Sequence, residues 1–282
     1  MWVRSSRTKN LCPTEVAIPE RFASAFLKVE QAKKHIDRLE REIIDFWSTN
    51  PYAIEVVGDP KNATGAYRIK GEPAPLPDGL TLTAGDAAHN LRSALDHFAC
   101  ASVATVTTNA AFPVWRAPRT PTPAEWRSLV LGKLQSAPTS LIDAVIDLRA
   151  YRGGAGQDIW ALDELDRVDK HQLLIAVAGA NTALVVDFGE VMAATFPDLY
   201  ADGQTPKLPM ALRPGAWTPV ATGAELFRVQ ISNGFKTDPK FIFEVALADP
   251  DALRGKPVAE ALRHLASETE SLLRRLAPLA QP

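Results

Sequence analysis

Cysteine is scarce in this sequence, and neither sign of charge is in excess. Only Cys12 and Cys100 occur among 282 residues, too few for a disulfide framework or a cysteine-based zinc site. The chain has 31 basic and 33 acidic residues, a formal net charge of -2. This balance excludes a bulk attraction to nucleic acid or to anionic lipid, so any such binding must come from a local patch.

Long apolar runs are also missing. No stretch approaches the roughly 20 apolar residues that a membrane-spanning helix needs. The first ten residues carry Arg4, Arg7 and Lys9, but no apolar segment of the kind found in signal peptides follows them. We therefore expect a cytoplasmic protein that does not enter a membrane.

Several familiar catalytic motifs are absent. The sequence has no phosphate-binding P-loop, no zinc-protease histidine pair, no EF-hand loop and no glycine-flanked serine elbow. The glycines of 153–156 lack the spacing and the preceding strand of a dinucleotide fingerprint. We expect no cofactor and no bound metal, although residues that converge from distant segments can still form a site.

Apolar periodicity predicts an α+β fold. Spacings of three and four residues indicate helices of a bundle near 19–48, 84–106, 139–172 and 257–279. Strand-like segments near 52–72 and 173–250 are expected as inserted or appended antiparallel β structure. Residues 1–18 read as an irregular arm, and 19–282 as a single α+β domain. The 46% hydrophobic content is ample for a core.

The predicted second helix has an unusual polar stripe. On a helix, steps of three and four place one set of polar side chains beside an apolar stripe: Asp86, His89, Asn90, Ser93, Asp96 and His97. In the simplest interpretation, Arg92 and Asp96 form an exposed ion pair, and the histidines and Asn90 bond neighbouring backbone. The cluster is then structural.

A metal site is one alternative. His89, Ser93 and His97 follow one another at steps of four, with carboxylates near, and imidazole and carboxylate suit zinc, iron or manganese. However, His89 and His97 are two turns apart, roughly 12 Å along the axis. A metal-dependent hydrolase would therefore need ligands from other helices.

Arg92 and His97 also have the arginine, four residues, histidine spacing. This resembles the motif of the HEPN superfamily, helical domains that include many metal-independent endoribonucleases. The resemblance implies His97 as general acid or base, Arg92 on the phosphate, and Asn90 and His89 beside them, with Asp96 in support. It also implies RNA as a partner and a homodimer that pairs two motifs. The wider pattern resembles an uncharacterised type of bacterial protein, which implies no activity.

A second polar cluster lies at 163–171. Read alone, it is a solvated face with the pairs Asp163–Arg167 and Asp166–Lys170. Alternatively Glu164 and His171, seven residues apart on one face, approach Arg92 and His97 and form one pocket. The leading hypothesis is a HEPN-like ribonuclease or a degenerate relative. The runner-up is a non-catalytic interaction or ligand-binding protein with a structural polar cluster, and a metal-dependent hydrolase comes third.

Overall fold

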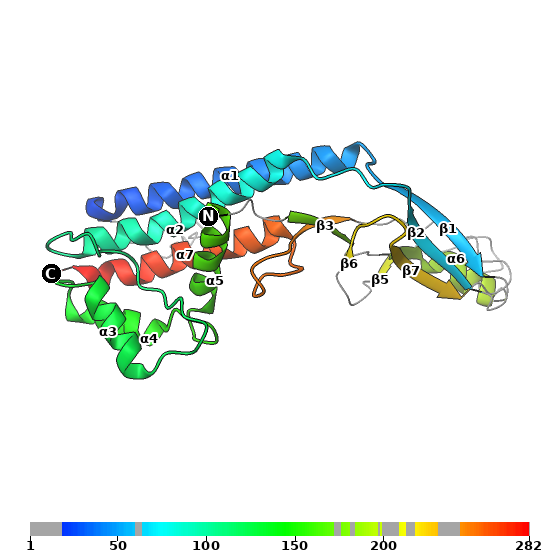
Figure 1. The fold of residues 1–282 in the computed structure, drawn as a ribbon. Helices are drawn as coiled ribbons and strands as arrows, with labels where there is room; N and C mark the ends of the chain where they lie inside the picture. Colours follow the sequence, from blue (N-terminus) through cyan, green and yellow to red (C-terminus); the bar gives the residue numbers. More distant parts are fainter. Residues whose placement is uncertain are drawn as a thin grey trace, which may run out of the picture.

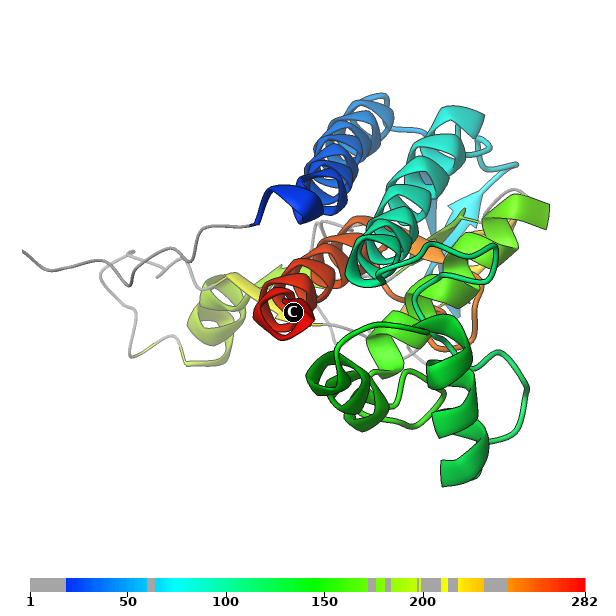
Figure 2. The ribbon, with the colours of Figure 1, turned by 90° about the vertical axis from the view of Figure 1, so that its left-hand side faces the viewer.

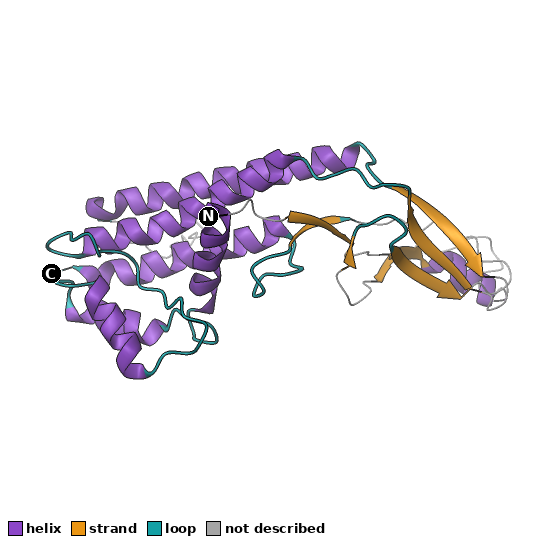
Figure 3. Ribbon diagram, in the orientation of Figure 1, coloured by secondary structure: helices purple, strands orange, loops and turns teal. Residues whose placement is uncertain are grey.

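The computed structural model describes residues 19–59, 64–171, 176–180, 184–196, 198, 209–212, 218–230 and 243–281. The long helices gather at one end of an elongated molecule, and the strands extend from it toward the other end, where the short helix α6 (Phe188–Thr195) also lies (Figures 1 and 3). This arrangement confirms the predicted α+β fold with a helical bundle and antiparallel β segments. The predicted arm at 1–18 lies outside the described residues.

Three long helices form the bundle: α1 (Ala23–Ser48), α2 (Asp78–Ser102) and α7 (Val258–Leu276). They lie side by side in both views (Figures 1 and 2). Each buries its apolar stripe as predicted, with Ile36, Leu265 and Leu272 at most 3% exposed and Ile43 partly buried. These stripes are too long to remain in water, so their burial drives the association of the helices.

Shorter helices cover one side of this bundle. α5 (Gln157–His171) packs on α2 and α7, and runs across their direction (Figure 1). α3 (Pro123–Lys133) packs on α4 (Thr139–Leu148). Thr122 and Glu125 form a complete capping box that fixes the start of α3. The short turns η1 (Glu20–Phe22) and η3 (Ala277–Ala280) flank α1 and α7.

The β structure is antiparallel. β1 (Ala53–Asp59) pairs with β2 (Thr64–Lys70), which pairs with β7 (Glu225–Gln230). β3 (Ala176–Ala180) lies between β6 (Thr218–Pro219) and β8 (Glu244–Leu247), and β4 (Leu184–Asp187) pairs with β5 (Pro209–Leu212). A helix, α6 (Phe188–Thr195), follows β4. The β structure expected near 52–72 and 173–250 is thus present, whereas the helix α6 within the second range was not predicted.

The start of α2 was predicted wrongly. The helix begins at Asp78, about two turns before residue 84, and its N-terminal flanking residue is Pro77. Thr83 lies inside the helix, is 3% exposed, and donates its hydroxyl to Glu42 of α1 at 3.0 Å. Packing against α1 therefore extends the helix through Gly79, which local propensity disfavours. No helix in the described part of the chain has the length and apolarity to cross a bilayer.

Candidate functional site

Arg92 is buried where α2 meets α5. Its side chain is 6% exposed and donates Nε to Asp163 at 2.6 Å, Nη1 to Asp96 at 2.6 Å and Nη2 to the carbonyl of Phe112 at 3.2 Å. The predicted Arg92–Asp96 pair exists, but it is not the exposed pair expected from sequence. Its additional partners come from α5 and from the segment 109–117.

Asp163 is the buried counterion of two arginines. It is fully buried and also accepts from Arg116 Nε at 2.7 Å and Nη2 at 2.8 Å. Burial raises the pKa of Asp163, but the Arg116 hydrogen bonds and the Arg92 charge outweigh burial and hold that pKa below its ordinary value. Asp163 is therefore an ionised anchor. The predicted Asp163–Arg167 pair is wrong, because Arg167 binds Glu164 at 2.6 Å instead.

Two further contacts continue this interface. His89 Nδ1 donates to Asp166 at 2.9 Å, and Asp166 is 2% exposed. Gly85 lies against the carboxylate of Asp169, so closely that a Cβ at Gly85 would overlap it. The contacts therefore pair Gly85 with Asp169, His89 with Asp166 and Arg92 with Asp163. The polar stripe of α2 thus lies along the polar stripe of α5, with the residue numbers running in opposite directions. The side chain of Lys170, the expected partner of Asp166, lies outside the described residues.

The other polar face of α2 is simpler. His97 is exposed, and no hydrogen bond or ion pair involves it within the described ranges. Asn90 is partly buried, accepts from Lys28 at 3.3 Å and donates to the carbonyl of Asp86 at 2.8 Å. Ser93 is partly buried and lies 3.4 Å from His89, the half-exposed histidine of the interface with α5. His97 therefore does not share the buried network of Arg92.

The two polar clusters converge through Asp163 and Asp166. Asp163 and Asp166 make the contacts to α2, whereas Glu164 turns to Arg167. The side chain of His171 is outside the described residues. Within the described part of the chain, no three histidine, cysteine or acidic side chains are grouped as ligands of a metal ion.

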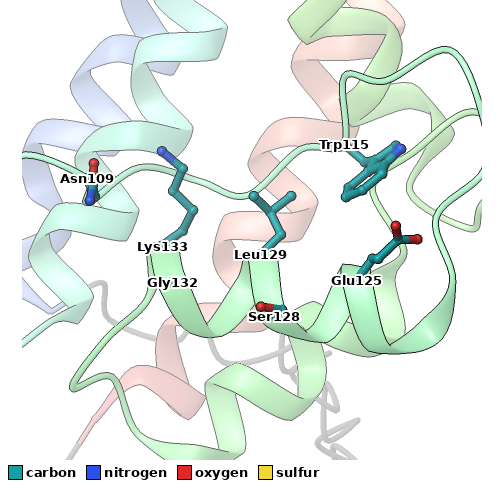
Figure 4. A pocket seen from close by; sticks show the side chains of 7 residues that line it. All are labelled: Asn109, Trp115, Glu125, Ser128, Leu129, Gly132 and Lys133. Atoms are coloured by element: carbon teal, nitrogen blue, oxygen red, sulfur yellow. The ribbon is translucent and has the colours of Figure 1, made fainter.

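A groove adjoins the buried network. Two pockets of about 490 and 420 Å³ share Trp115, Leu129 and Lys133 on their walls. Figure 4 shows Leu129 and Lys133 projecting from α3 toward the loop that carries Trp115. The second pocket is also lined by Arg92, Asp96 and Arg116, so the polar cluster forms its inner end. The other residues that line the first pocket are Asn109, Glu125, Ser128 and Gly132.

The loop wall of the groove is held at many points. The N–H of Phe112 donates to Asp96 at 2.9 Å, and its carbonyl accepts from Arg92. The N–H of Trp115 bonds the carbonyl of Ala150 at 3.1 Å, and its indole N–H bonds the carbonyl of Arg119 at 2.8 Å. These bonds fix the indole ring before any ligand arrives, which lowers the entropic cost of binding.

The start of α3 holds the same wall from the other side. The guanidinium of Arg119 lies over the Trp115 ring, 5.5 Å from its centroid, and pairs with Glu125. The Arg119 hydrogen bond, with help from Thr122, lowers the pKa of Glu125 to about 2. Glu125 is therefore a carboxylate at neutral pH, and Arg119 neutralises it.

Sequence reasoning missed this groove. Its loop wall packs on the helices through Phe112 and Val114, which are buried in the core. Arg116 and Arg119, placed one and four residues after Trp115, were the available signal. Comparison with protein-family models, with curated proteins and with solved structures finds no match to this chain.

Proposed function

We propose that this protein is a ligand-binding protein whose Arg92 cluster is structural and whose ligand occupies the groove between α3 and residues 109–117. The burial of Arg92 against Asp163, Asp96 and the Phe112 carbonyl carries this proposal. An arginine that binds a transferring phosphate must present its N–H groups to the substrate. Here three of them hold parts of the protein together.

The groove has the properties of a small-molecule site. Its pockets of about 490 and 420 Å³ lie within the range of about 300–1,000 Å³ that is common for ligand sites. The walls combine an aromatic ring and a leucine with a few polar groups, which is the usual composition of such sites. The arginine network positions one wall, so the structural cluster supports binding.

A blocking substitution tests this proposal. A Cβ at Gly132 meets nothing within 4 Å, and Gly132 lines the groove, so Gly132→Trp fills it without a clash at Cβ. Gly79→Trp is the matched control, because Gly79 is also helical, exposed and open. Binding of indole, 2-naphthamide and 2-naphthoate is measured by ligand-observed NMR. Ligands of this size are expected to bind with dissociation constants on the order of 1 mM.

At least one of these compounds should bind the natural protein and the Gly79→Trp control, and binding should be lost in Gly132→Trp. The proposal is wrong if none binds, or if Gly132→Trp binds as well as the control. Retained cooperative unfolding of Gly132→Trp would show that the lost binding does not come from a lost fold.

The exposure of His97 favours a second candidate function, the HEPN-like ribonuclease. An exposed imidazole is available as a general acid or base. If the protein has this activity, it should cleave single-stranded RNA, but not DNA, in the presence of EDTA. The rate of cleavage should rise as the protein forms dimers. His97→Ala should reduce the rate by about 10²–10⁴-fold. An absence of RNA cleavage, or cleavage that survives His97→Ala, would contradict this candidate.

A further inference from the structure

The charges around the groove do not cancel. Arg92 and Arg116 face Asp96 and Asp163 in ion pairs of 2.6–2.7 Å. Arg119 and Glu125 neutralise each other at the other end. Lys133 lines both pockets, and no ion pair or hydrogen bond involves it among the residues that the structure describes. The described groove therefore carries an excess of one positive charge, and this charge belongs to Lys133.

The helical spacing of α3 places this charge beside an apolar surface. Leu129 and Lys133 are four residues apart, so they lie on one face of the helix, and Figure 4 shows both side chains on the groove side. Trp126, Val130 and Leu134 form the neighbouring, buried face. Trp115 stands across the groove from Leu129 (Figure 4). A ring that contacts Trp115 and Leu129 would therefore have the ammonium of Lys133 near its edge.

On the basis of the proposed binding function, we propose that the ligand is a planar aromatic acid: a ring that contacts Trp115 and Leu129 and a carboxylate or phosphate that pairs with Lys133. The ring supplies buried apolar area and stacks on the indole. The anionic group compensates the uncompensated ammonium in a charge-assisted hydrogen bond. Asn109 and Ser128 offer neutral hydrogen-bonding groups on the same walls.

Two compounds of the same shape test this assignment. 2-Naphthoate and 2-naphthamide differ in charge and little else, and 2-naphthyl phosphate tests whether a phosphate replaces the carboxylate. The natural protein should bind 2-naphthoate about tenfold more tightly than 2-naphthamide, the usual size of a charge-assisted hydrogen bond. Acetate and inorganic phosphate, which lack the ring, should bind much more weakly than the naphthyl acids.

Variants assign the preference to one residue. Lys133→Gln should remove the difference between 2-naphthoate and 2-naphthamide, and Lys133→Arg should restore much of it. Lys34→Gln removes an exposed lysine of α1 and should change nothing. Tighter binding of 2-naphthyl phosphate than of 2-naphthoate would assign the anion to the phosphate class, and the reverse order to the carboxylate class.

Equal affinity for 2-naphthoate and 2-naphthamide in the natural protein would overturn the assignment, as would a preference that persists in Lys133→Gln. If both compounds bind equally and both are lost in Gly132→Trp, the binding function stands and only the acidic ligand is wrong. If Gly132→Trp binds both as well as the natural protein does, both proposals are wrong.

Discussion

The two polar faces of α2 have the same kinds of residues but different surroundings. The inner face, formed by Gly85, His89, Arg92 and Asp96, meets α5 and the 109–117 segment and includes a buried arginine. The outer face, formed by Asp86, Asn90, Ser93 and His97, is exposed or partly buried. A helix can thus carry one polar stripe that holds the fold and another that does not. Residue type alone does not separate them.

The difference has an energetic origin. Taking Arg92 and Asp163 out of water is costly, and the mutual attraction and hydrogen bonds offset that cost only while both partners are present. Removal of one partner leaves a buried charge alone. The outer face remains in contact with water, so its hydrogen bonds contribute little. Substitutions on the two faces should therefore differ strongly in their effect on stability.

The largest effect is expected for Asp163→Ala. It leaves Arg92 buried without its main counterion and should lower the free energy of unfolding by about 3–5 kcal/mol, as measured by urea denaturation. Asp158→Ala is the matched control on the same helix, because Asp158 pairs with His264 and both are exposed. The control should cost no more than about 1 kcal/mol. Equal losses for both variants would remove the distinction between a buried anchor and a surface pair.

Gly85→Ala is expected to have the next largest effect. Its new methyl group would overlap the Asp169 carboxylate, so the Asp169 side chain must move away from α2, at a cost of about 1 kcal/mol. Gly79→Ala, where a Cβ meets nothing within 4 Å, should be neutral or stabilise α2 by up to about 1 kcal/mol. Thermal unfolding of both variants measures the contrast. A Gly85→Ala protein as stable as Gly79→Ala would show that the position of the Asp169 carboxylate against Gly85 contributes nothing to stability.

Acid should weaken the inner face selectively. The folded pKa of Asp163 lies below its ordinary value of 3.8, so its ionised form stabilises the folded state. This stability is fully present above the unfolded pKa and is lost as the pH falls through the folded pKa. Urea denaturation between neutral pH and pH 3 should show a smaller loss of stability for Asp163→Asn than for the natural protein. An identical pH dependence in both would argue against this role of Asp163.

Sequence periodicity predicted the elements more successfully than their partners. The repeat of Leu262, Leu265 and Leu272 predicted α7 because burial of one face requires spacings of three and four. The partner of Arg92 could not be predicted in this way, since Asp163 is 71 residues away and i,i+4 rules describe only neighbours on one helix. The groove was missed for the same reason. Trp115 and Lys133 line it together only because tertiary packing brings their segments to the same place, and they share no periodic pattern.

The smallest effect is expected on the outer face. His97 is exposed and has no polar partner among the described residues, so His97→Ala should change the free energy of unfolding by less than about 0.5 kcal/mol. Urea denaturation of His97→Ala and of the natural protein under the same conditions measures this change. A loss above about 1 kcal/mol would mean that His97 has a structural contact and that the two faces are less different than the structure indicates.

A double-mutant cycle between Arg92 and Asp163 tests the central claim, that Arg92 is a structural anchor, most directly. The free energies of unfolding of the natural protein, Arg92→Met, Asp163→Leu and the double variant give the coupling between the two side chains. We expect a favourable coupling of about 2–3 kcal/mol, with the double variant more stable than the sum of the single losses allows. A coupling below about 0.5 kcal/mol, the error of simple additivity, would contradict it.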